Sequence, residues 1–325
     1  MRHQDLRLLG ATAMAPAAWG MTYLVTTELL PAGRPLMTGV VRALPAGLVL
    51  AALTRRAPAG CWWSRAIVLG TLNIGAFFAL LFIAAYRLPG GVAATLGAVQ
   101  PLVAAGLAAI LLRERLRVST VVAGASGLAG VGLLVLRAGA ALDAAGVAAG
   151  LAGTTCMAAG VVLTKRWGRP VPLLAFTSWQ LVAGGLVLAP VALAVEGAPP
   201  SLSAGNLLGY LWLATGGTAV AYTLWFRGIE RLPVARVSVL ALLSPVVATL
   251  AGWVVLHQAL TTTQLVGVVL VLAAVTIGQR GDNGVVGAPA ARRAVAALRT
   301  LAGPGRAGGS PLPTAAATLR SPTGC

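Results

Sequence analysis

The feature that most constrains this chain is a succession of about ten apolar blocks near 20 residues long, separated by short gaps that hold most of the charge. A helix of roughly 20 apolar residues crosses the ~30 Å hydrocarbon core of a bilayer. Of the 325 residues, 58% are hydrophobic and 10% are charged, whereas a soluble domain carries about 25% charge. Because lipid offers the backbone no hydrogen-bond partner, each crossing segment must be helical. The sequence therefore predicts an all-α membrane protein.

Hydropathy and charge breaks predict ten transmembrane helices. They are placed near residues 8–27, 36–54, 65–85, 91–112, 119–137, 144–166, 171–195, 205–227, 234–256 and 262–279. The first block continues through Trp19 to Thr27, which favours an uncleaved helix over a signal peptide. The segment 280–325 is rich in Gly, Ala, Pro and Arg, so we expect a basic, disordered tail.

Basic residues indicate how these helices face, because cytoplasmic loops of membrane proteins collect Lys and Arg. With a cytoplasmic N-terminus the outer segments hold only Arg34, Arg87 and Arg137. The inner segments then hold Arg2, Arg7, Arg55, Arg56, Arg65, Arg113, Arg115, Arg117, Lys165, Arg166, Arg169, Arg227 and Arg231. The sequence thus predicts a multi-pass protein of the cell membrane with both termini cytoplasmic. These loops and the tail account for the formal net charge of +17, and nucleic acid is not expected as a partner.

An internal repeat divides the chain. A shift of 144 residues places Arg87-Leu88-Pro89 on Arg231-Leu232-Pro233, and Pro101 on Pro245. A shift of 138 residues places Arg42 on Gln180. We therefore expect two five-helix repeats, 1–139 and 140–279, followed by the tail. Five is odd, so the second repeat is inverted relative to the first, a plan that recurs in secondary transporters with a substrate site between the repeats.

A series of short segments along the chain resembles the drug/metabolite transporter superfamily, EamA type. The segments that carry the resemblance are Ala17–Gly20, Arg42, Arg87–Pro89, Gln100–Pro101, Leu112–Arg115, Trp179–Gln180, Ala221–Trp225, Ser244–Pro245 and Gln264–Gly267. The resemblance covers roughly residues 8–279 and implies a ten-helix exporter of small metabolites such as amino acids. One departure is Gln258, which stands where the family usually has a second-half Glu opposite Glu114.

Polar and aromatic residues inside the predicted helices are the candidate substrate-binding residues. Arg42 lies inside the second span, where a cation is costly and by default functional; it either binds a substrate carboxylate or phosphate, or snorkels to the outer interface. Gln100 and Ser244 precede the matched prolines, at predicted helix breaks near the midplane. The remaining candidates are Trp19, Tyr23, Asn73, Gln180 and Tyr222. Aromatic rings with a few polar groups suit an amphipathic solute, although core packing would also explain each ring.

The sequence predicts no catalytic residue, metal site or cofactor. No Asp or Glu lies in the middle of a predicted span, and two His and three Cys are too few and too scattered for a metal site. The alternatives to a transporter are a membrane-embedded enzyme acting on lipid or isoprenoid substrates and a non-transporting scaffold. The expected partners are a small-molecule substrate and the bilayer. Glycines in the fifth and sixth spans indicate internal packing first, with a homodimer as the alternative.

The predicted orientation can be tested with topology reporters. A reporter fused after residue 280 is expected in the cytoplasm and one inserted in 197–204 outside it, because of the basic asymmetry. Alkaline phosphatase and green fluorescent protein fusions, which are active on opposite sides, measure this. Both reporters on one side would contradict the ten-span topology.

Overall fold

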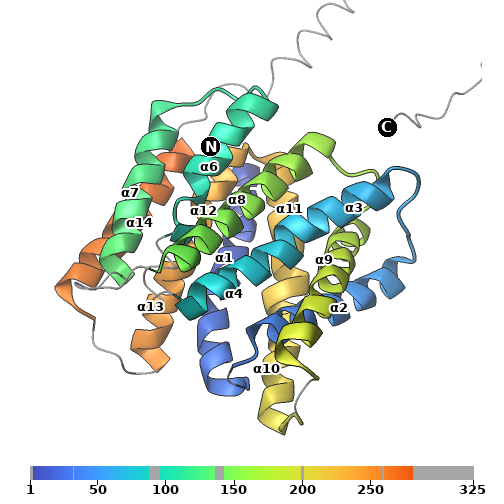
Figure 1. Cartoon of the computed structure of the whole chain (residues 1–325). Coiled ribbons are helices and arrows are strands. Elements are labelled where there is room, and N and C mark those ends of the chain that lie inside the picture. The colour runs from blue at the N-terminus through green and yellow to red at the C-terminus, as the bar shows by residue number, and fades with distance from the viewer. Residues whose placement is uncertain are drawn as a thin grey trace, which may run out of the picture. The chain divides into compact units, whose positions relative to one another are not determined.

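The computed structural model describes residues 3–31, 33–87, 96–135, 143–198, 201–255, 257 and 260–280, and the regular structure within them is helical (Figure 1). The elements of the first half are α1 (His3–Leu29), α2 (Pro35–Thr54), α3 (Trp62–Gly70), η1 (Thr71–Gly75), α4 (Ala76–Arg87), α6 (Gln100–Leu111) and α7 (Val118–Val135). Those of the second half are α8 (Ala144–Trp167), α9 (Leu173–Glu196), α10 (Ala204–Ala214), η2 (Thr215–Val220), α11 (Ala221–Arg231), α12 (Val234–Leu240), α13 (Leu243–Val255) and α14 (Thr262–Arg280). The predicted tail beyond Arg280, and Gln258, lie outside the described residues.

Eight helical runs of the described chain are long and apolar enough to cross a membrane. They are Leu6–Thr26, Pro35–Thr54, Trp62–Leu81, Ala144–Trp167, Leu173–Glu196, Ala204–Arg231, Val234–Val255 and Thr262–Gln279. Two shorter apolar helices, Gln100–Leu111 and Val118–Leu134, lie where the fourth and fifth spans are predicted. The prediction of an all-α, multi-pass membrane protein is confirmed.

Two of the long helices contain a π-helical segment. In the run α3–η1–α4 this segment is Thr71–Gly75, and in α10–η2–α11 it is Thr215–Val220. The two segments begin 144 residues apart, since 215 − 71 = 144. π-helical turns are rare and occur often at functional sites. They widen the helix and change its hydrogen-bond register, which redirects the carbonyl groups at that point.

The helix breaks predicted at the two prolines are present. A turn at residues 98–99 precedes α6, which begins with Gln100-Pro101, and a turn at 241–242 separates α12 from α13. Proline has no N–H and clashes with the carbonyl four residues earlier, so a helix stops before it. In the first turn of a new helix its missing N–H costs nothing, and both prolines occupy that position.

Glycines allow the closest helix contacts in the described chain, and the most extensive pairings are α2 with α9 and α7 with α14. A Cβ atom at Gly47 would lie 2.8 Å from the Val182 nitrogen, and one at Gly185 would lie 2.9 Å from the Leu44 Cβ. A Cβ at Gly130 would lie 3.0 Å from the backbone oxygen of Gly267. The α2–α9 and α7–α14 crossings are therefore close backbone approaches.

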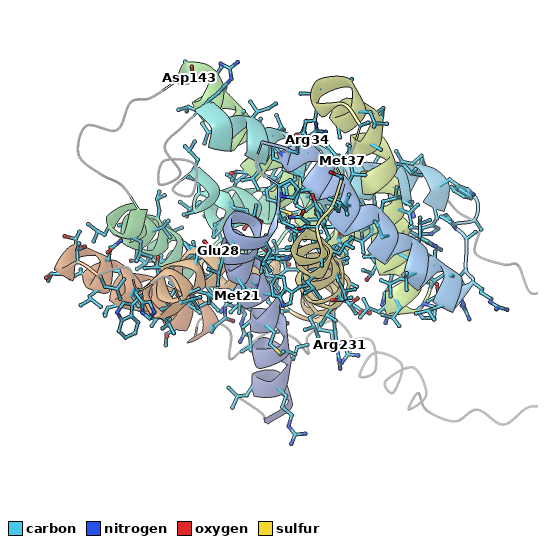
Figure 2. The ribbon with its side chains drawn as sticks, turned by 90° about the horizontal axis from the view of Figure 1, so that it is seen from below. Met21, Glu28, Arg34, Met37, Asp143 and Arg231 are labelled. Atoms are coloured by element: carbon cyan, nitrogen blue, oxygen red, sulfur yellow. The ribbon has the colours of Figure 1, made fainter. Side chains whose placement is uncertain are left out.

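The pair α2–α9 is also tied at both ends. At one end the Glu196 carboxylate accepts the backbone N–H groups of Leu36 and Met37 at 2.7 and 2.8 Å, and Arg34 donates to the backbone oxygen of Ala198. Figure 2 shows Arg34 and Met37 together at this end of α2. At the other end the Trp179 indole donates to the backbone oxygen of Arg56 at 2.7 Å. A carboxylate at a helix N-terminus satisfies free N–H groups and the positive end of the helix dipole.

The α3–α9 contact gives a stability prediction. A Cβ at Gly184 would lie 2.5 Å from both the Gly70 oxygen and the Ile74 Cβ, so Gly184→Ala is expected to destabilise by about 1–3 kcal/mol. The matched control is Gly106→Ala, because no atom lies within 4 Å of a Cβ at Gly106. Thermal unfolding of the detergent-purified variants measures the difference. Equal melting temperatures would contradict the close packing of α3 and η1 on α9.

Candidate functional site

The side chain of Arg42 is buried at 6% exposure, roughly 10 Å along α2 from its first residue. Its Nε donates to Thr218 Oγ1 at 3.1 Å, and one terminal nitrogen donates to the Gly217 oxygen at 3.0 Å. The guanidinium also lies 4.9 Å from the centre of the Phe78 ring, a cation–π distance. Arg42 therefore does not snorkel to the interface; it binds the π-helical segment η2.

A second polar contact lies at the other π-helical segment. Asn73, in η1, donates from Nδ2 to Gln180 Oε1 on α9 at 2.8 Å and to Thr164 Oγ1 on α8 at 3.3 Å. The hydroxyl of Tyr222 lies 3.5 Å from the backbone oxygen of Asn73. Asn73 and Gln180 are fully buried. Gly160 makes room for the amide, because a Cβ there would lie 2.2 Å from Asn73 Oδ1.

The two contacts correspond under the sequence repeat. A shift of 138 residues relates Arg42 to Gln180. A shift of 144 residues relates Asn73 to Gly217, since 73 + 144 = 217. Arg42 of the first half binds η2 of the second half, and Gln180 of the second half binds η1 of the first. The backbone oxygens at these two equivalent positions each face a side chain from the opposite half.

Aromatic rings form one side of this region. Trp19 on α1 lies 5.2 Å from Tyr222 and 5.1 Å from Trp225, both on α11, measured between ring centres. The ring of Phe226 lies 5.7 Å from Tyr222. Tyr222, Trp225 and Phe226 are buried. The rings join the buried polar contacts to the core between α1 and α11.

Several buried polar atoms in the described residues have no hydrogen-bond partner. Four of these atoms are N–H donors, on Trp19, Trp225, Gln100 and Gln180. Asn73 Oδ1 and Ser238 Oγ are also unpartnered. An unsatisfied buried polar group costs about 1–3 kcal/mol, so such atoms need an explanation such as a ligand or water. An excess of donors suits a ligand that presents oxygen acceptors.

The structure brings five of the eight predicted binding residues into this connected set: Arg42, Trp19, Asn73, Gln180 and Tyr222. Arg42 joins the set through Gly217 and Thr218 of η2, the segment that runs directly into α11 with Tyr222. Ser244 lies beside α1, where its backbone oxygen would be 2.6 Å from a Cβ at Gly20. Gln100 is buried at the start of α6. The side chain of Tyr23 lies outside the described residues.

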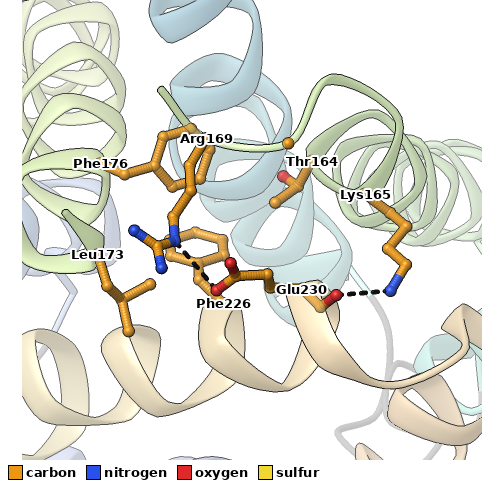
Figure 3. Close-up of a pocket in the computed structure, with 8 residues that line it drawn as sticks. Thr164, Lys165, Arg169, Leu173, Phe176, Phe226 and Glu230 are labelled. Atoms are coloured by element: carbon orange, nitrogen blue, oxygen red, sulfur yellow. Dashed lines mark hydrogen bonds and ion pairs between the residues drawn. The ribbon is translucent and has the colours of Figure 1, made fainter. Parts of the chain in front are cut away.

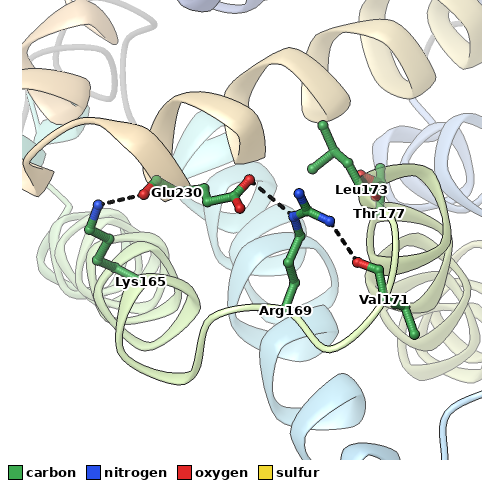
Figure 4. A network of polar contacts seen from close by, with 6 residues as sticks. All are labelled: Lys165, Arg169, Val171, Leu173, Thr177 and Glu230. Carbon is green, nitrogen blue, oxygen red and sulfur yellow. Dashed lines mark hydrogen bonds and ion pairs between the residues drawn. The ribbon is translucent and has the colours of Figure 1, made fainter.

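A cavity of ≈ 100 Å³ opens at the ends of α8, α9 and α11 (Figure 3). Its lining residues are Thr164, Lys165, Gly168, Arg169, Leu173, Phe176, Phe226 and Glu230. Arg169 Nε pairs with Glu230 Oε2 at 3.0 Å, and its NH1 donates to the Val171 oxygen at 2.8 Å (Figure 4). Lys165 Nζ donates to the backbone oxygens of Glu230 and Leu232 at 2.8 and 3.0 Å.

Sequence reasoning missed five participants. Gly217 and Thr218 carry no obvious signal, although shifting Asn73 by 144 residues lands on Gly217. Thr164 looks like an ordinary helical threonine. Arg169 and Glu230 are read from the sequence as loop charges, because only the fold brings them to one cavity.

The chain has helices long and apolar enough to cross a bilayer. Its two halves carry helix breaks and π-helical segments at matching positions, and buried polar contacts join the halves. These features are typical of a multi-pass membrane transporter. The sequence profile of the EamA-like transporter family matches residues 8–136 and again residues 144–277. The chain belongs to this family.

Individual relatives agree with this assignment. Protein PecM of Dickeya dadantii is 47% identical over 267 residues, which cover 82% of this chain and 90% of PecM. A protein of Salmonella typhimurium named probable amino-acid metabolite efflux pump is 27% identical over 222 residues, covering 65% of this chain and 74% of that protein. A crystal structure matches with a TM-score of 0.73 at 23% identity, over 84% of this chain and 96% of the matched chain. The last comparison shows the fold.

The contacts of Arg42 lead to a transport prediction. Arg42→Ala is expected to reduce transport at least about tenfold, because it leaves the Gly217 oxygen and Thr218 without their buried partner. Arg42→Lys is expected to recover little, since an ammonium cannot reproduce a planar fork that binds two oxygens. Transport per inserted molecule in vesicles, with folding checked by size-exclusion chromatography, measures this.

Arg236→Ala is the matched control. Arg236 is half-buried, and its Nε donates to Gln279 Oε1 at 3.1 Å on α14, away from both π-helical segments. Arg236→Ala is expected to keep most of the transport. Normal transport by Arg42→Ala would remove Arg42 from the site.

Proposed function

We propose that this chain is a secondary transporter that exports a small metabolite, an amino acid or related compound, across the cytoplasmic membrane by alternating access. In this proposal ten transmembrane helices form two inverted five-helix repeats, 1–139 and 140–279, followed by a basic tail, 280–325. The observation that carries it is the reciprocal contact: Arg42 with η2, and Gln180 with η1. A substrate site between inverted repeats, near broken helices, is the arrangement by which such transporters work.

The packing of the helices supports the two-repeat plan. In the two-repeat plan α1, α2, α4 and α6 of the first half correspond to α8, α9, α11 and the α12–α13 pair of the second. Each contact between the halves should then have a counterpart: α4 packs on α8, and correspondingly α11 packs on α1. Likewise α1 packs on α13, and its counterpart α8 packs on α6. The shift of 138 also turns the Gly47–Val182 approach into the Gly185–Leu44 approach. The family profile, which matches twice along the chain, supports the same division.

The buried contacts can be made and lost as the halves move. Arg42 binds the Gly217 oxygen and the Thr218 hydroxyl of η2, and Gln180 accepts a hydrogen bond from the Asn73 side chain of η1. Both contacts join one proposed repeat to the other, so a rocking motion changes both at once. The unpartnered N–H groups of Trp19, Trp225 and Gln180 would then donate to a substrate. Substrate oxygens satisfy these donors, and the rings of Trp19 and Tyr222 accommodate its apolar part.

Export as the direction, and a metabolite as the cargo, are supported by the relative named as an amino-acid metabolite efflux pump. The predicted spans contain no central Asp or Glu, which argues against lipophilic cations as the dedicated cargo. We place both termini in the cytoplasm on the basic-residue asymmetry. The glycines of α7 pack within the chain, Gly127 against Leu242 and Gly130 against Gly267, so their faces support internal packing over a homodimer.

Reconstitution tests this function. Purified full-length protein in liposomes is expected to accelerate the movement of at least one compound in a screen of amino acids, nucleosides and sugars, compared with protein-free liposomes. The Arg42→Ala variant, folded and reconstituted equally, should lose that acceleration. A membrane-embedded enzyme or a scaffold would leave every compound at the rate of the protein-free liposomes, and that result would overturn the proposal.

A further inference from the structure

The cavity at the ends of α8, α9 and α11 combines a charged rim with an aromatic wall (Figure 3). Its charged lining residues are Lys165, Arg169 and Glu230, two cations and one acid. The ammonium of Lys165 donates to two backbone oxygens. The acid that pairs with Arg169 is Glu230. The polar end of the cavity is therefore centred on the guanidinium of Arg169.

The Arg169–Glu230 pair is one that another anion can replace. Both side chains are partly exposed to solvent, at 29% and 36%. Ion pairs of such exposure add little to stability, because water and salt screen them. The contacts of Arg42 differ in this respect, since its side chain is buried. Breaking this pair therefore costs the protein little, so an entering carboxylate can take the place of Glu230 on Arg169.

Two lines of side-chain contact connect the cavity lining to the buried site. Thr164 lines the cavity, and its hydroxyl accepts a hydrogen bond from Asn73 at 3.3 Å. Phe226 forms part of the wall together with Phe176, their ring centres 6.0 Å apart, and lies 5.7 Å from Tyr222. One polar and one aromatic contact thus connect the rim to the residues between the halves.

We infer that this cavity is the entry site for an anionic cargo with an apolar or aromatic body, whose carboxylate takes the place of Glu230 on Arg169. The inference rests on the proposed function, because it adds the chemical class of the cargo and its first binding position to the transport cycle. Arg169 presents a planar fork that matches a carboxylate. The Phe176 and Phe226 rings cover the apolar part, and Thr164 leads towards Asn73 and Gln180.

Equilibrium binding of radiolabelled benzoate to full-length protein in lipid nanodiscs tests the inference. Glu230→Gln is expected to bind benzoate about two- to fivefold more tightly, because the internal competitor for Arg169 is removed; this is the range that an exposed ion pair supplies. Arg169→Gln is expected to weaken binding at least about fivefold. The matched control is Arg166→Gln, three residues before Arg169, exposed and outside the cavity lining, which should change binding less than about twofold. Benzylamine, which has the same ring and the opposite charge, should not compete.

The gain in Glu230→Gln keeps the test decisive, since a misfolded variant cannot bind more tightly. Unchanged or weaker binding by Glu230→Gln, absence of benzoate binding in all variants, or competition by benzylamine would each overturn the inference. So would binding that is lost in Arg42→Gln and unaffected in Arg169→Gln, which would place benzoate at the deep site alone. If liposomes show no export while binding responds to both cavity substitutions, only the proposed function fails. Export with binding that ignores both substitutions overturns only the entry site.

Discussion

Inside a bilayer, a backbone carbonyl that loses its helical hydrogen bond cannot bind water instead, so the protein must supply another donor. This chain departs from regular α-helix at η1 and η2 and supplies partners from distant helices. Arg42 crosses from α2 to the Gly217 oxygen, and Tyr222 faces the Asn73 oxygen from α11. Because these partners come from the opposite half of the sequence, the irregular segments add polar contacts between the halves to the helix packing of α2 on α9 and α7 on α14. The buried cation, the amide pair and the aromatic rings are organised around that requirement.

The sequence predicted the helices well, because hydropathy and charge record where a chain meets lipid. The described helices lie within the predicted spans or a few residues beyond them, and the breaks before Pro101 and Pro245 follow from the chemistry of proline. The candidates that carry a polar or aromatic side chain, such as Arg42, Asn73 and Gln180, were visible for the same reason. The family assignment from the ordered series of segments was confirmed by the profile match.

The remainder depended on geometry that one-dimensional patterns do not carry. A π-helical turn leaves no hydropathy signal, so neither η1 nor η2 was predicted. Gly217 takes part through its backbone oxygen, and a glycine offers no side chain to draw attention to it. Arg169 and Glu230 are 61 residues apart, and their loops were assigned to the same membrane side without any indication that the two charges meet. The protein contacts of Arg42 with Gly217, Thr218 and Phe78 also depended on knowing its neighbours.

The pair α2–α9 is held at one end by Glu196 and at the other by Trp179, and it crosses where Gly47 and Gly185 bring the backbones together. Points close to an axis of rotation move least, so short contacts survive a rotation only near that axis. A rigid rotation of one half against the other that preserves the Gly47 and Gly185 approaches must pivot near their crossing. Arg42 and Gln180 are each five residues from these glycines, roughly 7.5 Å along the helix. Because they lie so near the pivot, Arg42 and Gln180 would move only a short distance in such a rotation, while the helix ends at the membrane surfaces would move much further.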